Sequence, residues 1–158
     1  MKRALLLALM LFVLVADQTT KSVARMSLAH AAPRHYGILT LLYTDNRGAF
    51  LSLGENFPDS VRTIVFDIAV AIGLAIAVIA LFCGKLHRGD DVALAAIIAG
   101  GIGNLIDRLR FAGRVTDFLY LAIGKLHTGV LNIADMAITF GVIWLMVSWM
   151  FSTRARVS

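Results

Sequence analysis

Two aspartates, Asp117 and Asp135, could form a pair of acids for acid–base chemistry. Asp117 lies in the segment Val-Thr-Asp-Phe (115–118), and Asp135 ends the segment Asn-Ile-Ala-Asp (132–135). Two carboxylates held close together share one proton, because they do not both ionise easily. The ionised member could take a proton from water while the protonated member donates to a scissile carbonyl. The pair therefore favours hydrolysis without a covalent nucleophile, and the sequence leaves open which aspartate holds the proton.

Each aspartate alone also has an ordinary structural interpretation. Asp117 alone would be a solvated loop acid, and Asp135 alone would be an acid favoured at a helix N-terminus by the helix dipole. Asn132 lies one turn before Asp135 and could orient it. Chemistry by the pair requires both acids to lie in one layer, so the elements that carry them must place them at one depth.

Two polar clusters precede the pair in the sequence. In Asp-Gln-Thr-Thr-Lys (17–21), Asp17 and Lys21 lie at i and i+4 on one helix face. We interpret them as an ion pair that supports the site rather than as catalytic residues. The cluster Asn-Arg-Gly-Ala-Phe (46–50), which begins at Asn46, would on its own be an ordinary turn.

A third cluster, Gly-Gly-Ile-Gly-Asn-Leu-Ile-Asp-Arg (100–108), combines glycines with polar residues. Its glycines, of which Gly100 is the first, could let membrane helices approach closely. They do not form a dinucleotide fingerprint, because no strand precedes them. Asn104 and Asp107 share a helix face, and Arg108 could neutralise Asp107. A polar face so close to lipid is hard to explain by packing alone, so a functional interpretation is favoured.

Composition indicates that the elements carrying these clusters lie in a membrane. Hydrophobic residues make up 59% of the 158 residues and charged residues 16%, against about 45–50% and about 25% in soluble domains. A chain this apolar could not cover its core with polar surface in water. The net charge of +5 fits attraction to anionic lipid head groups. Because no nucleic-acid motif is visible, we expect membrane lipid and no nucleic acid as a partner.

Four apolar segments predict four membrane-spanning helices, since one span needs about 20 residues. The sequence therefore predicts an all-α membrane protein, a four-transmembrane-helix bundle formed by a single domain. The helices are placed at 4–21, 63–83, 91–107 and 133–152, with outer segments at 22–62 and 108–132, within a domain of residues 1–158.

The first apolar segment also fits a cleaved secretory signal peptide, because Lys2 and Arg3 precede an apolar run that ends at Ala16. The pair of Asp17 and Lys21 favours a retained helix, since it continues the same helix beyond that run. Basic residues also predict that both termini are cytoplasmic, by the positive-inside rule. The cations concerned are Lys2, Arg3, Lys85, Arg88, Arg154 and Arg156.

This topology places three acids at one depth. Counted from the inner ends of their helices at 1.5 Å per residue, Asp17, Asp107 and Asp135 lie roughly 21–28 Å along. In a hydrocarbon core about 30 Å thick, all three fall at or just below the outer interface. Ionisable groups at that depth usually face the bundle interior or a wet cavity.

The outer segments predict a small extramembrane sheet, a β-cradle on the outer face. Residues 37–43 form a short apolar run, 44–48 resemble a turn, and 49–53 form a second run. Residues 114–123 also suit a strand.

Together, the five clusters in this order resemble the lipoprotein signal peptidase family, also called signal peptidase II, from about Asp17 to Asp135. The specific elements are Gly-x-x-Gly-Asn-x-Ile-Asp-Arg, Val-x-Asp-Phe and Asn-x-Ala-Asp. One departure is Phe50-Leu51, where relatives often have a small residue and then an aromatic.

The resemblance implies an aspartic endopeptidase with Asp117 and Asp135 as catalytic dyad. It implies four transmembrane helices, a β-cradle and a short mobile helix between the first two spans. The implied substrates are prolipoproteins whose lipobox cysteine bears diacylglycerol, cut just before that cysteine in the bacterial cytoplasmic (inner) membrane. We expect a monomer without a metal or other cofactor. Supporting or substrate-contacting roles are implied for Asp17, Lys21, Asn46, Gly100, Asn104, Asp107, Arg108, Asn132 and Ala134.

Three other classes of protein account for the sequence less well. A proton-coupled transporter or channel would more naturally place acids at several depths. A metalloprotease is disfavoured because the four histidines form no His-Glu-x-x-His pattern. A purely structural membrane subunit would leave the polar layer unexplained.

Overall fold

The computed structural model describes residues 2–47, 58, 61, 67–84, 86 and 89–154. The described part is mostly helical and contains one small antiparallel sheet. Its helices are α1 (Lys2–Ser27), α3 (Val70–Cys83), α4 (Asp90–Arg110) and α5 (Ile133–Arg154). Its strands are β1 (Arg34–Tyr36), β2 (Leu39–Asn46), β3 (Val115–Ile123) and β4 (Leu126–Leu131).

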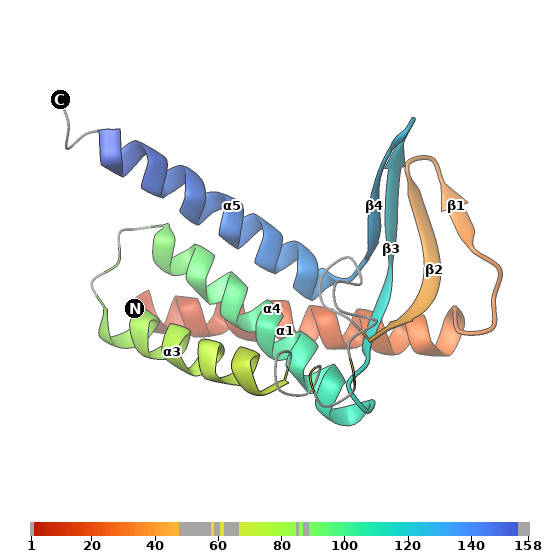
Figure 1. Cartoon of the computed structure of the whole chain (residues 1–158), viewed down its shortest axis with the longest axis horizontal. Helices are drawn as coiled ribbons and strands as arrows, with labels where there is room; N and C mark the ends of the chain where they lie inside the picture. Colours follow the sequence, from red (N-terminus) through yellow and green to blue (C-terminus); the bar gives the residue numbers. More distant parts are fainter. Residues whose placement is uncertain are drawn as a thin grey trace.

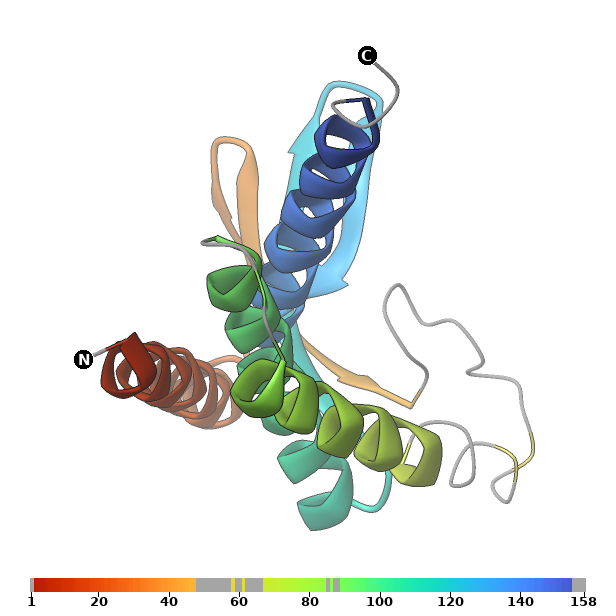
Figure 2. The ribbon, with the colours of Figure 1, turned by 90° about the vertical axis from the view of Figure 1, so that its left-hand side faces the viewer.

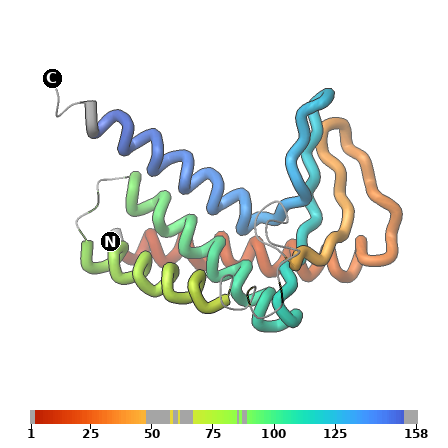
Figure 3. Tube along the Cα trace, viewed as in Figure 1, coloured from red at the N-terminus to blue at the C-terminus, as the bar shows by residue number. Residues whose placement is uncertain are grey.

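Helix α4 is the central element, because α1, α3 and α5 all pack against it. The sheet stands at one end of the helices, where α5 begins (Figure 1). Helices α1 and α4 run toward the sheet, and α3 and α5 run away from it (Figure 1). Seen from the other end, α5 inclines away from α1 (Figure 2). The start of α1 and the end of α5 therefore lie at the same end of the molecule, opposite the sheet (Figure 3).

Three of the helices, α1, α4 and α5, are long and apolar enough to cross a membrane. The predicted second span, residues 63–83, appears as a shorter apolar helix over Asp67–Cys83. Its first residues lie outside the described part, as do the cations at 85 and 88, residues 48–53 and the short helix expected before the second span. The membrane character of the chain is thus supported by three helices.

The helices bury polar side chains and expose apolar ones. Large apolar side chains such as Phe12, Ile79 and Trp149 are exposed. The largest fully buried side chains are those of Lys21, Ile98, Asn132, Asp17, Asp107 and Asp117. This arrangement suits a lipid environment, where polar groups must find partners inside the protein.

The antiparallel sheet has the strand order β1-β2-β3-β4. Strand β3 agrees with the strand predicted at 114–123, whereas β1 and β4 were not predicted. The turn predicted at 44–48 is wrong at its start, because Thr44, Asp45 and Asn46 continue β2 and pair with β3. Pairing with a neighbouring strand has overridden the local turn preference of these residues. The chain turns instead at Gly37 and Gly124, which have positive φ angles.

Helices α4 and α5 approach closely through two glycines. A Cβ atom on Gly100 would lie 2.5 Å from the backbone oxygen of Ala134, and one on Gly141 would lie 2.7 Å from that of Ala93. The close approach predicted for Gly100 is therefore present, and it brings α4 against the first turn of α5.

Replacing Gly100 by alanine is expected to destabilise the protein by about 1–3 kcal/mol, because the new methyl group would have to push α5 away. Thermal unfolding in detergent measures this change. Gly73→Ala is the control: nothing lies within 4 Å of a Cβ there, and alanine in a helix is favoured over glycine by about 0.5–1 kcal/mol. A Gly100→Ala protein that melts at or above the wild-type temperature would contradict the close contact.

Candidate active site

Asp117 lies in β3 and is only 1% exposed. A bulge in β2 determines which residue of β2 faces it. Leu41 pairs with Leu119, but Thr44 pairs with Asp117, so β2 uses one more residue than β3 between these pairs. Side chains alternate along a strand, so the extra residue places Asn46 on the same sheet face as Asp117. The Asn46 Nδ2 donates to Asp117 Oδ2 at 2.8 Å.

Asn132 connects the two aspartates. It precedes α5 as its N-cap, a position that asparagine favours. The backbone amide of Asp135 donates to Asn132 Oδ1 at 2.8 Å, and the backbone amide of Asn132 donates to Asp135 Oδ2 at 3.2 Å. The Asn132 Nδ2 donates to Asp117 Oδ1 at 2.6 Å. One buried residue therefore orients both acids, Asp117 through its side-chain amide and Asp135 through its backbone amide.

A second path links Asp135 to α1. Asn104 on α4 donates from Nδ2 to Asp135 Oδ1 at 2.9 Å. Its Oδ1 accepts hydrogen bonds from Lys21 Nζ at 2.8 Å and from Asn132 Nδ2 at 3.2 Å. These partners fix which way the Asn104 amide points, so the nitrogen faces the acid.

Asp17 holds α1, α4 and α5 together. Its Oδ2 lies 2.9 Å from Lys21 Nζ, and both side chains are fully buried. Its Oδ1 accepts a hydrogen bond from the Ala134 amide at 2.9 Å. A Cβ on Gly103 would lie only 2.6 Å from Asp17 Oδ2, so the glycine leaves room for this carboxylate. The predicted ion pair of Asp17 and Lys21 is present and lies inside the helix bundle.

Asp107 has different partners from those predicted. Arg108 was expected to neutralise it, but the charges near Asp107 Oδ2 are Lys21 Nζ at 3.8 Å and Arg25 Nη1 at 3.4 Å. The Thr116 amide also donates to Asp107 Oδ2 at 3.0 Å. Adjacent residues on a helix differ in direction by about 100°, so the Arg108 side chain points to a different side of α4 from Asp107.

Arg25 was missed in the sequence. Its Nη1 donates to Thr116 Oγ1 at 2.8 Å, next to Asp117 in β3, and its guanidinium stacks on Phe111 at 4.5 Å from the ring centre. The signal was available, because Arg25 follows Asp17 and Lys21 at successive four-residue steps on one helix face.

Burial, followed by the charge of Asp135, raises the pKa of Asp117 to about 7. Hydrogen bonds from Asn46 and Asn132 act in the opposite direction, because they stabilise the ionised carboxylate. An aspartate with a pKa near 7 retains a proton over much of the neutral range, which suits a carboxyl that shares one.

A cavity of about 490 Å³ opens beside Asp135. Arg108 and Asn104 line its polar end, and apolar residues of α3, α4 and α5 such as Val70 and Ile143 line the rest. We call it the Asp135 cavity. It could admit an apolar segment whose polar part reaches the acids.

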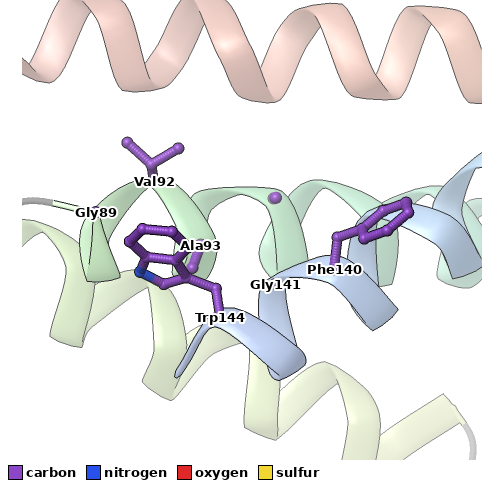
Figure 4. Close-up of a pocket in the computed structure, with 7 residues that line it drawn as sticks. Gly89, Val92, Ala93, Phe140, Gly141 and Trp144 are labelled. Carbon is purple, nitrogen blue, oxygen red and sulfur yellow. The ribbon is translucent and has the colours of Figure 1, made fainter. Parts of the chain in front are cut away.

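A smaller cavity of about 300 Å³ lies between α4 and α5 near Gly89 (Figure 4). Trp144 and Phe140 line it, and its wall holds no titratable side chain. A Cβ on Gly89 would lie 2.7 Å from the Trp144 ring. This cavity therefore offers shape but no acid–base chemistry.

The structure thus brings the residues singled out in the sequence into one connected cluster. Asp117, Asp135, Asn46, Asn104 and Asn132 share direct hydrogen bonds. Asp17, Lys21, Asp107 and Ala134 form the layer behind them, Gly100 packs against Ala134, and Arg108 lines the Asp135 cavity.

Comparison with known proteins shows the family of this chain. The family model described as signal peptidase (SPase) II matches residues 9–151. A lipoprotein signal peptidase of Geobacter sulfurreducens is 38% identical over 94% of this chain and 93% of its own. One of Syntrophus aciditrophicus is 36% identical over 93% of this chain and 94% of its own.

Solved structures give the same result. A bacterial membrane enzyme solved by the in meso method at 2.3 Å has a TM-score of 0.82 and 25% identity, covering 95% of this chain and 90% of its own. A second, at 1.9 Å, has a TM-score of 0.79 and 26% identity, covering 92% of both chains. From its sequence over most of its length and from its fold, this chain belongs to the signal peptidase II family of membrane proteases.

Proposed function

We propose that this protein is an aspartic endopeptidase whose catalytic dyad is Asp117 and Asp135. The observation that carries the proposal is the shared contact with Asn132, which donates to Asp117 and caps the helix that begins beside Asp135. An asparagine bound to both acids holds them in fixed orientation, as general acid–base chemistry requires.

In the proposed reaction, the ionised aspartate takes a proton from water, and the water oxygen attacks the scissile carbonyl. The protonated aspartate donates to the carbonyl oxygen, which gives a tetrahedral intermediate. As the C–N bond breaks, the aspartate that took the water proton gives it to the leaving amine, and the other aspartate recovers its proton from a hydroxyl of the intermediate. Asn46 and Asn104 each donate to one acid and hold it in place. Asp17, Lys21, Asp107 and Ala134 support these donors from behind, Gly100 allows the close crossing, and Arg108 contacts substrate.

The proposed substrates are prolipoproteins whose cysteine bears diacylglycerol, cut just before that cysteine. The lipid chains would stay in the membrane while the peptide bond reaches the dyad, and the Asp135 cavity would take the apolar part of the substrate. We further propose a single domain with four membrane crossings in the bacterial inner membrane. Both termini would be cytoplasmic, the sheet and site would lie at the outer face, and the protein would act as a monomer.

The test is cleavage by the purified full chain in detergent–lipid micelles, with the product identified by mass. We expect a diacylglyceryl-modified precursor to be cut at least about 10²-fold faster than the same precursor without lipid, because remote binding energy positions the peptide bond. Cleavage should persist with a metal chelator, a thiol alkylator and a serine-acylating reagent. Equal cleavage of the unlipidated precursor would refute the substrate, and inactivation by a chelator that zinc reverses would refute the mechanism.

The raised pKa of Asp117 predicts the pH dependence of turnover. Because this pKa is about 7, the dyad loses its shared proton as the pH rises through that value, and kcat should fall above about pH 7. In Asn46→Leu the ionised carboxylate loses a donor, so the pKa of Asp117 should rise and the fall in kcat should move to higher pH.

Profiles of kcat against pH for both proteins measure this shift. Asp45→Asn is the control, because Asp45 is next to Asn46 in β2 but is exposed and contacts Tyr43 and Arg114, and its profile should match the wild type. An Asn46→Leu profile that falls at the same or lower pH would contradict the role given to Asn46.

A further inference from the structure

A third cavity, of about 410 Å³, lies between α1 and the end of α4 that is nearer the sheet. It shares no lining residue with the Asp135 cavity. We call it the α1/α4 cavity. It is lined by Val15, Gln18, Thr19, Ser22, Arg25 and Arg110.

The wall of the α1/α4 cavity carries one positive charge that lies outside the ion-pair network of Asp17, Lys21, Arg25 and Asp107. Inside that network, the carboxylates of Asp17 and Asp107 are matched by Lys21 and Arg25. Arg110, by contrast, is exposed in the last turn of α4 and has no ion pair with a carboxylate of the described residues. The cavity therefore suits a ligand with a single negative charge.

The donors around the cavity suit a phosphate group. Arg25 contacts Asp107 and Thr116 through Nη1, and a guanidinium carries five N–H donors in all. Arg110 offers a second guanidinium, and Thr19 and Ser22 offer hydroxyl groups. Guanidinium pairs with phosphate oxygens are short, charge-assisted and often bidentate.

An apolar strip of α1 leads away from this polar wall. Leu11, Phe12 and Val15 are 62%, 71% and 54% exposed. They precede Thr19 and Ser22 at three- and four-residue steps, so they lie on the same side of the helix. A ligand bound here would meet cations at one end and an apolar surface along the next turns, as an amphipathic lipid does.

We propose that the α1/α4 cavity binds the phosphodiester headgroup of an anionic membrane phospholipid, with an acyl chain along Leu11, Phe12 and Val15. Arg110 and Arg25 hold the phosphate, and the hydroxyls of Thr19 and Ser22 complete its contacts. The site rests on the proposed membrane placement of this end of α1 and is independent of the dyad.

Native mass spectrometry of the full chain in detergent, titrated with phosphatidylglycerol or phosphatidylcholine, tests the site. We expect the wild type to half-saturate with one phosphatidylglycerol at roughly tenfold lower concentration than with phosphatidylcholine, as a charged hydrogen bond allows. Arg110→Gln should lose most of this preference and Arg110→Lys should keep part of it. Lys125→Gln, which removes the same charge from the exposed β3–β4 turn, should keep all of it.

The alternatives give different results. Equal losses in Arg110→Gln and Lys125→Gln would mean a general effect of surface charge and would overturn the site. Displacement of the lipid by equimolar glycerophosphoglycerol or inorganic phosphate would show a free-anion site and overturn the lipid assignment. Asp135→Asn should bind phosphatidylglycerol as the wild type does, so failure of the cleavage proposal and failure of this one can be told apart.

Discussion

Replacing either Asp117 or Asp135 by asparagine is expected to lower kcat at least about 10³-fold, since each change removes one partner of the acid–base pair. The amide keeps the size of the carboxyl, so the hydrogen bonds from Asn46 and Asn104 are the contacts most altered. Single-turnover cleavage of the diacylglyceryl-modified precursor measures the loss. Both variants should insert in the membrane and accumulate as the wild type does.

Asp45→Asn is the matched control for these variants. Asp45 lies in β2 beside Asn46, but it is exposed and contacts Tyr43 and Arg114 rather than the dyad. Its variant should retain turnover close to the wild type. Near-normal turnover in Asp117→Asn or Asp135→Asn would remove that residue from the dyad.

Replacing Lys21 by methionine is expected to give the largest loss of stability. The Lys21 ammonium is fully buried and lies 2.9 Å from Asp17 Oδ2 and 3.8 Å from Asp107 Oδ2. Its removal leaves a carboxylate without its cation in a dry interior, which costs about 3–5 kcal/mol. For a chain of this size the melting temperature should fall by roughly 6–20 °C. Thermal unfolding in detergent measures it.

Two further variants separate charge from packing. Lys125→Met removes an exposed lysine and should change stability by no more than about 0.5 kcal/mol. Asp17→Asn combined with Lys21→Met restores neutrality and should recover about 0.5–3 kcal/mol relative to additivity. If Lys21→Met melts like the wild type and binds substrate normally but loses single-turnover cleavage, then Lys21 acts in the chemistry and not as support.

The residues of the polar site were more predictable from the sequence than the contacts between them. Asp17 and Lys21 are separated by one helical turn, so their pairing followed from local geometry. The grouping of Asp17, Asp107 and Asp135 followed from helix rise, whereas their depth in a membrane stays a prediction. The partner of Asp107 did not, because Arg25 reaches it from another helix, and contacts between distant segments are not encoded in local spacing.

The sheet was predicted least well for a similar reason. Thr44 to Asn46 have the composition of a turn, yet they pair with β3. The Asn46–Asp117 contact joins residues that are 71 positions apart in the sequence. The four-residue spacing of Arg25 after Lys21 was visible, but nothing local distinguished it from an ordinary exposed arginine. Long-range pairing, rather than propensity, decided these positions.

The register of β2 after its bulge makes the site sensitive to chain length as well as to residue type, because Thr44 pairs with Asp117 and Asn46 with Val115. Deleting the extra residue of the bulge would give a regular ladder that keeps Asn46 on the face of Asp117. Deleting Asp45 instead, with Thr44 still paired with Asp117, would place Asn46 opposite Thr116 and so on the other face of the sheet, because side chains alternate. Asp117 would then lose its 2.8 Å donor while every side chain in the site kept its identity. A single-codon deletion at Asp45 would therefore act on the dyad much as Asn46→Leu does, and a one-residue insertion at the same place would restore it.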